Sequence, residues 1–313
     1  MNQTTLSARR PVVALMTDFG LSDGYIGVMK GVIASITPEA NIIDITHAIA
    51  PQNILSGAWI LASVYRYFPG LETSSASRGS EGSIDLLPAQ PSHRTGTVFV
   101  CVVDPGVGSS RGAIAVHAGK WFFVGPDNGL FSYVLAEQPV HAACILSNPA
   151  YHLSQVSSTF HGRDIFAPVA AHLARGVALN ELGTQIDFAT LQRVDLPRPV
   201  QREGAIDGHV VHIDHFGNLI SNIPFTMVPD LFSRPQVRMI FPNSGVEVSN
   251  RKRFFAEGSD DGQPFLYVNS SGYIGIAVRN GNAAQMLSAG SPVWGTGNGM
   301  PITLSGTRSL DQC

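Results

Sequence analysis

The chain of 313 residues has few cysteines, no cluster of basic residues and no long apolar run. Its three cysteines are an odd number without CxxC spacing, which argues against a disulfide framework and favours a reduced, cytoplasmic compartment. The net charge is −3, and the absence of a lysine and arginine block argues against nucleic acid or an anionic membrane as a partner. No apolar run approaches the roughly 20 residues of a spanning helix, and residues 1–10 do not resemble a secretory signal.

Common signatures of phosphate binding, serine hydrolysis and metal binding are also missing. Gly106-Val107-Gly108 lacks the third glycine of the dinucleotide fingerprint, and neither a Walker motif nor G-x-S-x-G occurs. Among His209, His212 and His215, the first and last share one face of a strand while His212 points to the other face. We therefore expect no metal site.

The first part of the chain alternates strand and helix patterns, which predicts an α/β domain over residues 11–196 with a mainly parallel central sheet. Asp23 and Asp164 precede helical patterns and are the expected N-caps. Residues 71–95 are rich in Ser, Gly and Pro, which indicates a mobile surface insertion. The expected strands are 11–16, 41–45, 97–103, 113–117 and 121–124, and the expected helices are 24–36, 54–68, 128–137 and 165–174.

Short strand patterns with turn signals dominate after about residue 204 and predict a smaller all-β, barrel-like domain over 204–300. Residues 1–10 and 301–313 are interpreted as tails. The expected strands are 205–213, 219–223, 237–241, 264–268, 273–278 and 292–295.

Charged residues follow several of the predicted strands. Asp104 and Arg111 flank the loop after strand 97–103, where open α/β sheets place ligands. Taken alone, such a pair is more often a structural ion pair than part of a site. Asp18 ends the first strand, where a carboxylate either accepts both hydroxyls of a ribose or caps a turn. His161 precedes a helix whose positive end discourages protonation. Residues 214–218 either grip an amine or a base, or form a hairpin turn.

Six motifs occur in order along the chain and together resemble one family, the S-adenosyl-L-methionine (SAM) hydroxide adenosyltransferases, or SAM hydrolases, which are relatives of the SAM-dependent fluorinase and chlorinase. The resemblance runs from about residue 11 to residue 295 and excludes 71–95. The motifs are Thr17-Asp18-Phe19-Gly20, Asp104-Pro105-Gly106-Val107-Gly108, Phe160-His161-Gly162-Arg163-Asp164, Asp214-His215-Phe216-Gly217-Asn218, Asn269-Ser270-Ser271-Gly272-Tyr273 and Asn280-Gly281-Asn282-Ala283-Ala284.

The resemblance implies an N-terminal α/β domain, a C-terminal β-barrel and a homotrimer whose sites lie between the N-terminal domain of one subunit and the C-terminal domain of the next. It implies that SAM and water give adenosine and L-methionine without a cofactor. The implied catalytic set is Asp104, Arg111 and His161. The implied substrate contacts are Asp18 with ribose, Asp214 with methionine, Ser270 with the methionine carboxylate, and Asn218, Phe255 and the backbone near Gly281 with adenine.

Two positions depart from the fluorinase pattern. Gln52 stands where the fluorinase has a tryptophan that packs on ribose, and Ser271 stands where it has an arginine. Both departures concern substrate recognition.

In the implied reaction an oxygen nucleophile attacks ribose C5′ of the sulfonium substrate and displaces the sulfur as a thioether. An arginine partner makes a carboxylate a weaker base, so Asp104 is not expected to activate water by itself. We expect Arg111 and His161 to stabilise an oxygen nucleophile while Asp104 orients them and receives or relays the proton. A halogenase is the first alternative, but a carboxylate about 4 Å from a halide repels it by roughly 4 kcal/mol at an effective dielectric near 20. A non-catalytic SAM or adenosine sensor is the second. A SAM-dependent methyltransferase is disfavoured because a glycine-rich loop is missing after the first strand.

Overall fold

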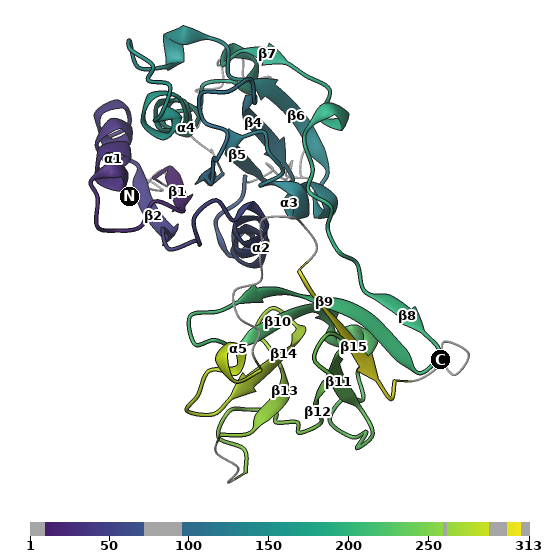
Figure 1. Cartoon of the computed structure of the whole chain (residues 1–313). Coiled ribbons are helices and arrows are strands. Elements are labelled where there is room, and N and C mark those ends of the chain that lie inside the picture. The colour runs from purple at the N-terminus through teal and green to yellow at the C-terminus, as the bar shows by residue number, and fades with distance from the viewer. Residues whose placement is uncertain (1–9, 72–95, 259–261, 288–298, 308–313) are drawn as a thin grey trace, which may run out of the picture. The chain divides into compact units, whose positions relative to one another are not determined.

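The computed structural model describes residues 10–71, 96–258, 262–287 and 299–307. The chain divides into two compact units, Met1–Val194 and Asp195–Cys313 (Figure 1). The predicted insertion at 71–95, apart from Leu71, and the predicted strand at 292–295 lie outside the described residues. Within the described ranges, no helix is both long enough and apolar enough to span a bilayer.

The first unit contains a mixed seven-stranded sheet, which confirms the α/β class. Strands β2 (Asn41–Thr46), β1 (Val12–Thr17), β3 (Val98–Val102) and β5 (Trp121–Pro126) lie side by side in this order and pair in parallel. Strand β4 (Ala113–Ala118) pairs antiparallel with both β5 and β6 (Val140–Ile145). The connection from β3 to β4 is short and contains no helix, too short for the crossover that a parallel return requires, so β4 runs in the opposite direction. The strand order is β2, β1, β3, β5, β4, β6 and β7 (Thr184–Gln185).

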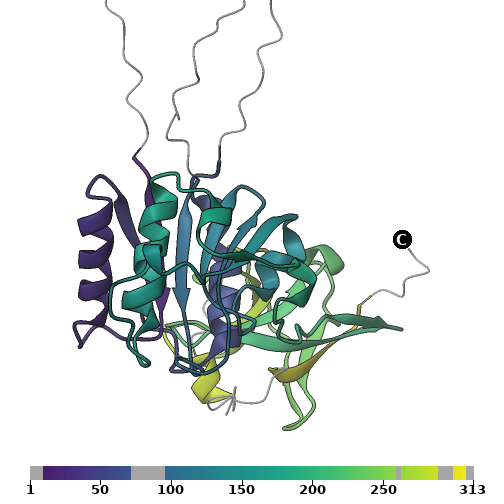
Figure 2. The same cartoon turned by 90° about the horizontal axis from the view of Figure 1, so that it is seen from above.

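Helices cover both faces of this sheet. Helices α1 (Tyr25–Ile36) and α4 (Ala167–Ala174) pack against each other on one face, as Figures 1 and 2 show. Helices α2 (Ile54–Val64) and α3 (Ser132–Glu137) cover the other. Short 3₁₀ turns complete the unit at Tyr65–Tyr67, Pro149–Tyr151, Leu179–Glu181 and Phe188–Thr190.

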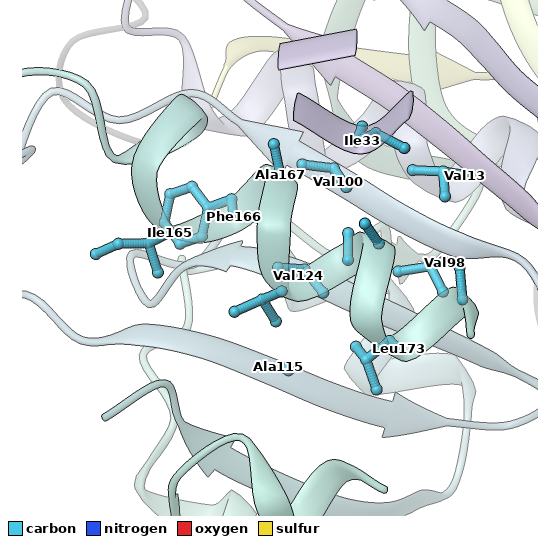
Figure 3. Packing of buried hydrophobic residues seen from close by; sticks show 14 of the residues in the cluster. Val13, Ile33, Val98, Val100, Ala115, Val124, Ile165, Phe166, Ala167 and Leu173 are labelled. Atoms are coloured by element: carbon cyan, nitrogen blue, oxygen red, sulfur yellow. The ribbon is translucent and has the colours of Figure 1, made fainter. Parts of the chain in front are cut away.

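Strand β3 is apolar throughout because both of its faces are buried. Val98 and Val100 pack beneath α1 and α4 (Figure 3), while Phe99 and Cys101 face the core under α2 and α3. Full burial of each of these valine and phenylalanine side chains contributes roughly 1.5–3 kcal/mol. The end of β3 is therefore a rigid support for Asp104, which follows it.

The structure corrects both predicted N-caps. Gly24 is the N-cap of α1 and makes no side-chain capping bond, so Asp23 is not the cap. Asp164 is fully buried inside a π-helical turn, Gly162–Phe166, that precedes α4. Its carboxylate accepts hydrogen bonds from Arg163 Nε at 2.5 Å and from Ser157 N at 2.8 Å, which replaces the capping role.

The second unit is an antiparallel sheet that nearly closes into a barrel, as predicted. Its order is β12 (Val246–Val248), β11 (Arg238–Phe241), β15 (Met300–Ser305), β9 (Ala205–Ile213), β10 (Leu219–Pro224), β14 (Tyr273–Val278) and β13 (Pro264–Val268), with β8 (Val200–Arg202) beside β9. A bridge between Arg251 and Leu266 joins the two ends of the sheet. A 3₁₀ turn (Phe225–Met227) and the short helix α5 (Ala283–Met286) lie between strands.

Strand β15 corrects the interpretation of 301–313 as a tail. Met300–Ser305 pair with both β9 and β11, and Ile302 and Leu304 are buried in the barrel core. Residues 308–313 lie outside the described part.

Candidate active site

Three side chains meet at the edge of the first sheet where β3 ends. Asp104 lies just beyond β3, and Arg111 lies just before β4, which begins at the same edge because it is antiparallel to β5. His161 immediately precedes the π-helical turn. The sheet topology thus brings together residues that are up to 57 positions apart in the chain, from 104 to 161.

Arg111 is the centre of this cluster. Its Nε donates to Asp104 Oδ1 at 2.9 Å, and its Nη2 donates to Asp104 Oδ2 and to His161 Nδ1, the latter at 2.9 Å. Its Nη1 donates to Gly112 O at 3.3 Å, and the guanidinium lies over the Phe166 ring. The side chains of Arg111 and Asp104 are only 10% and 5% exposed. The expected charge pair therefore exists and is largely removed from water.

The arginine fixes the tautomer of His161. A guanidinium has only donors, so His161 Nδ1 must accept and the ring proton of the neutral imidazole resides on Nε2. Burial lowers the pKa of His161 and the Arg111 charge lowers it further, although Asp104 and Asp164 act in the opposite direction. His161 is therefore a neutral donor through Nε2 near neutral pH.

The loop between Asp104 and Arg111 is fixed by a close backbone approach. Gly108 has φ +78°, and a Cβ there would lie 2.2 Å from Ser158 O, in the segment that leads to His161. Ser109 Oγ donates to Gly106 O at 2.6 Å and accepts from Arg111 N at 3.2 Å. The loop after Asp104 is thus held against the segment that leads to His161 and is hydrogen-bonded to the backbone of Arg111.

Asp18 follows β1, which pairs with β3, so it lies at the same edge of the sheet. Its Oδ2 accepts a hydrogen bond from Gln52 N at 2.8 Å. Gln52 adopts a left-handed conformation with φ 64°. Oδ1 keeps its full capacity to accept hydrogen bonds from a ligand.

In the second unit, residues 214–218 form the hairpin turn between β9 and β10. Asp214 Oδ1 accepts from the backbone N–H groups of Phe216 and Asn218, both at 2.9 Å, and its Oδ2 accepts from Asn218 Nδ2 at 2.7 Å. Gly217 has φ +82°, and a Cβ there would overlap Asn282, so this turn packs directly on the loop that contains Gly281. The hairpin reading is confirmed, and one oxygen of Asp214 retains accepting capacity.

Phe255 belongs to the same region through Tyr267. The two rings lie 5.2 Å apart, and Phe255 is 46% exposed. Burial raises the pKa of Tyr267, and the nearby negative charge of Asp214 raises it further. Ser270, in contrast, lies in the turn between β13 and β14, at the ends of those strands that point away from residues 214–218.

Two other features of the structure are a cavity and a set of histidines. A cavity of about 380 Å³ in the second unit is lined by Arg198, Arg202, His209 and Pro301 among others, and by none of the predicted substrate residues. Over the described ranges, no three histidine, cysteine or acidic side chains are grouped closely enough to hold a metal ion. The histidines at 209, 212 and 215 are therefore not assembled into such a cluster.

Sequence patterns did not reveal the groups that orient the predicted residues. Gln52 N, which binds Asp18, is a backbone donor, and Tyr267 is an ordinary strand residue in the sequence. One sequence signal could have indicated an unusual backbone at Gln52. It stands between Pro51 and Asn53, two turn-forming residues just before a predicted helix.

The chain is a two-domain protein with an α/β unit that carries a partly buried Asp–Arg–His cluster, followed by a small β-barrel unit. The model of the SAM hydroxide adenosyltransferase N-terminal domain matches residues 13–73 and 75–183, and the model of the C-terminal domain matches residues 208–292. The chain belongs to the SAM hydroxide adenosyltransferase family.

Relatives agree with this assignment. A protein of Salinispora arenicola named (R)-S-adenosyl-L-methionine hydrolase is 34% identical over 90% of this chain and 95% of its own length. A Thermus thermophilus protein of the same name is 34% identical over 94% and 99%. A fluorinase of an Actinoplanes species is 29% identical over 85% and 90%. The crystal structure of an uncharacterized conserved protein from Thermotoga maritima gives a TM-score of 0.77 at 32% identity, covering 94% of this chain and 99% of that one.

Replacing Gly108 by alanine tests the loop geometry. The left-handed φ costs a residue with a Cβ about 1–2 kcal/mol, and the overlap with Ser158 O adds to this, so Gly108→Ala should lower the free energy of unfolding by at least about 1 kcal/mol. Gly106→Ala is the matched control, because a Cβ at Gly106 makes only ordinary contacts of 3.4 Å. Urea denaturation of both variants checks this, and equal stability would contradict it.

Proposed function

We propose that this protein hydrolyses SAM to adenosine and L-methionine at a site containing Asp104, Arg111 and His161. The observation that carries the proposal is the contact of these three side chains, with Arg111 bound to both others, in a chain of the SAM hydroxide adenosyltransferase family. The relatives named above are (R)-SAM hydrolases, so we extend the proposal to the (R) form of the sulfonium.

The reaction chemistry suits a site of this kind. Attack on ribose C5′ releases a neutral thioether, so the positive charge of the sulfonium disperses on the way to the transition state. Water stabilises the reactant charge more than the transition state, so a site that excludes bulk water favours reaction. The remaining requirement is to hold an oxygen opposite sulfur, near 3–3.5 Å from the carbon.

The hydrogen bonds of Arg111 refine its role. Four of its five N–H groups donate to Asp104, His161 and Gly112, which leaves one Nη1 hydrogen without a partner described here. We therefore assign Arg111 mainly to holding Asp104 and His161 in place. Asp104 keeps spare lone pairs on both oxygens and receives the proton of the attacking water.

His161 supplies the complementary donor. Its Nδ1 is occupied by Arg111, so its Nε2–H is the group that can hold the oxygen nucleophile. A neutral imidazole donor can stabilise developing hydroxide character without taking up the proton itself.

Substrate recognition is assigned to the remaining predicted residues. Asp18 binds the ribose hydroxyls through Oδ1. Asp214 Oδ2 binds the methionine ammonium, and Asn218, Phe255 and the backbone near Gly281 contact adenine. Ser270 is proposed to bind the methionine carboxylate, and its turn lies away from residues 214–218 within one barrel.

Halogenation is the second candidate, because fluorinases are among the relatives. The buried carboxylate of Asp104 disfavours a halide next to it, and Arg111 is already occupied by protein acceptors. Water, being neutral, meets no such repulsion.

A product assay tests the proposal. Purified protein incubated with a mixture of both sulfonium epimers of SAM should release adenosine and L-methionine, leave the (S) epimer, and form no halogenated nucleoside when chloride or fluoride is added.

Asp104→Asn should lower kcat about 100- to 10,000-fold, because it removes the proton acceptor. Glu247→Gln, in an exposed ion pair with Arg238, is the control and should behave as wild type. Stoichiometric SAM binding without turnover would instead support a sensor.

The pH profile tests the role of His161. Because burial and Arg111 lower its pKa, the active neutral form should persist down through the ordinary histidine value of 6.5, and kcat/KM should fall only at lower pH. Protonation would place an N–H on Nδ1 facing Arg111 and break their hydrogen bond. In His161→Ala, kcat should drop and this acid limb should disappear. An active variant with an unchanged profile would remove His161 from the mechanism.

We also propose a homotrimer in which neighbouring subunits share the sites, as the resemblance implies. Light scattering of the purified protein should give about three times the chain mass of 33.3 kDa. Mixing the inactive variants Asp104→Asn and Asp214→Asn should restore partial activity through hybrid trimers. A monomer that retains full activity would contradict this arrangement.

A further inference from the structure

Two loops at the edge of the first sheet are joined by three hydrogen bonds. One loop segment, 17–20, begins at the last residue of β1 and carries Asp18, and the other, 47–53, connects β2 to α2. Thr17 Oγ1 bonds His47 Nδ1 at 2.9 Å, and Gly20 N donates to His47 O at 2.8 Å. Gln52 N donates to Asp18 Oδ2 at 2.8 Å. The position of the Asp18 carboxylate therefore depends on the second loop.

The Thr17–His47 contact is the buried part of this connection. Thr17 is fully buried, and His47 is 4% exposed. Thr17 Oγ1 also accepts from Phe19 N at 3.2 Å, so a single hydroxyl links the histidine to the backbone on the far side of Asp18. When the ring proton of a neutral His47 lies on Nε2, the Thr17 hydroxyl can donate its own proton to His47 Nδ1.

The other side of the His47 ring faces a charged residue. His47 Nε2 lies 3.1 Å from Asp44 Oδ1, although the groups are not aligned as a hydrogen bond. Asp44 Oδ2 is bound by Lys30 Nζ at 2.6 Å. Burial acts to raise the pKa of Asp44, but Lys30 and His47 outweigh it and the net shift is downward, so the carboxylate stays charged beside the ring. This electrostatic contact favours the Nε2–H tautomer and so keeps Nδ1 free to accept from Thr17.

Gln52 completes the arrangement from the backbone. It is one of two described non-glycine residues with a positive φ, a conformation that is unfavourable for a residue with a Cβ. Asn53 follows it as the N-cap of α2, its side chain accepting from Ser56 N at 2.9 Å. The helix cap holds the strained residue so that its N–H points at Asp18.

We propose that Thr17 and His47 are positioning residues for ribose recognition: they hold the two loops together so that Asp18, with Oδ2 fixed by Gln52, presents Oδ1 to a ribose hydroxyl. The inference rests on the proposed function, because it takes Asp18 as the ribose-binding acid. Under this proposal the protein distinguishes ribose from 2′-deoxyribose with the help of the buried Thr17 hydroxyl, which does not itself contact the substrate.

Calorimetric titration with adenosine and with 2′-deoxyadenosine tests the proposal. The wild-type protein should prefer adenosine by at least about tenfold, since a hydrogen bond to a carboxylate is among the stronger kinds. Thr17→Val keeps the shape of the side chain but removes the hydroxyl, and should bring the ratio of the two dissociation constants close to one. Thr17→Ser retains the hydroxyl and should restore the ratio.

Thr37→Val is the matched control. Thr37 is equally buried, and its hydroxyl donates to Ala171 O at 2.8 Å, between α1 and α4. This variant should lose thermal stability as Thr17→Val does but keep the wild-type ratio. If the wild type discriminates and Thr17→Val keeps the same ratio, the positioning role is wrong while the proposed function stands. If the wild type neither binds adenosine nor cleaves SAM, the proposed function itself fails.

Discussion

The bidentate contact between Arg111 and Asp104 is the interaction on which the candidate site depends. Removing two charges from water is costly, and the cost is offset only when their remaining hydrogen-bonding groups are satisfied. Here both carboxylate oxygens and four guanidinium N–H groups have partners, and the guanidinium lies over Phe166. Losing either charge would leave the other buried and unpaired. The pair therefore fixes the loop, and Arg111 in turn fixes the tautomer of His161.

The sequence predicted the positions of the strands around this ion pair better than the direction in which each strand runs in the sheet. The apolar run at 97–103 and the charged loop after it correctly predicted β3 and the sheet edge. The antiparallel direction of β4 was not predicted, because nothing in its own residues distinguishes the two directions; the length of the connection decides it. β15 was missed because Met300–Ser305 follow a glycine-rich stretch and become a strand only by pairing between β9 and β11.

For the candidate site, residue types drew attention to two acids but not to the groups that donate to them. Asp18 and Asp214 were selected as candidates because carboxylates at turns are conspicuous in a sequence. Gln52 N was not, since a backbone N–H exists at almost every position and only a left-handed φ aims this one. The two readings of Asp214, turn former and ligand group, turned out to be compatible. Its Oδ1 stabilises the hairpin, while its Oδ2 has one local partner and room for another.

The charge balance of the cluster also bears on the choice of nucleophile. Asp104 and Arg111 cancel each other, and His161 is neutral because burial and the guanidinium lower its pKa. A halide entering such a site gives up its hydration without gaining a free cation from these three residues. In the proposed mechanism a water molecule loses less, because it donates to Asp104 and accepts from His161 Nε2 at the same time. The same ion pair that is costly to bury thus removes the positive charge that a halide would need, and favours oxygen as the attacking atom.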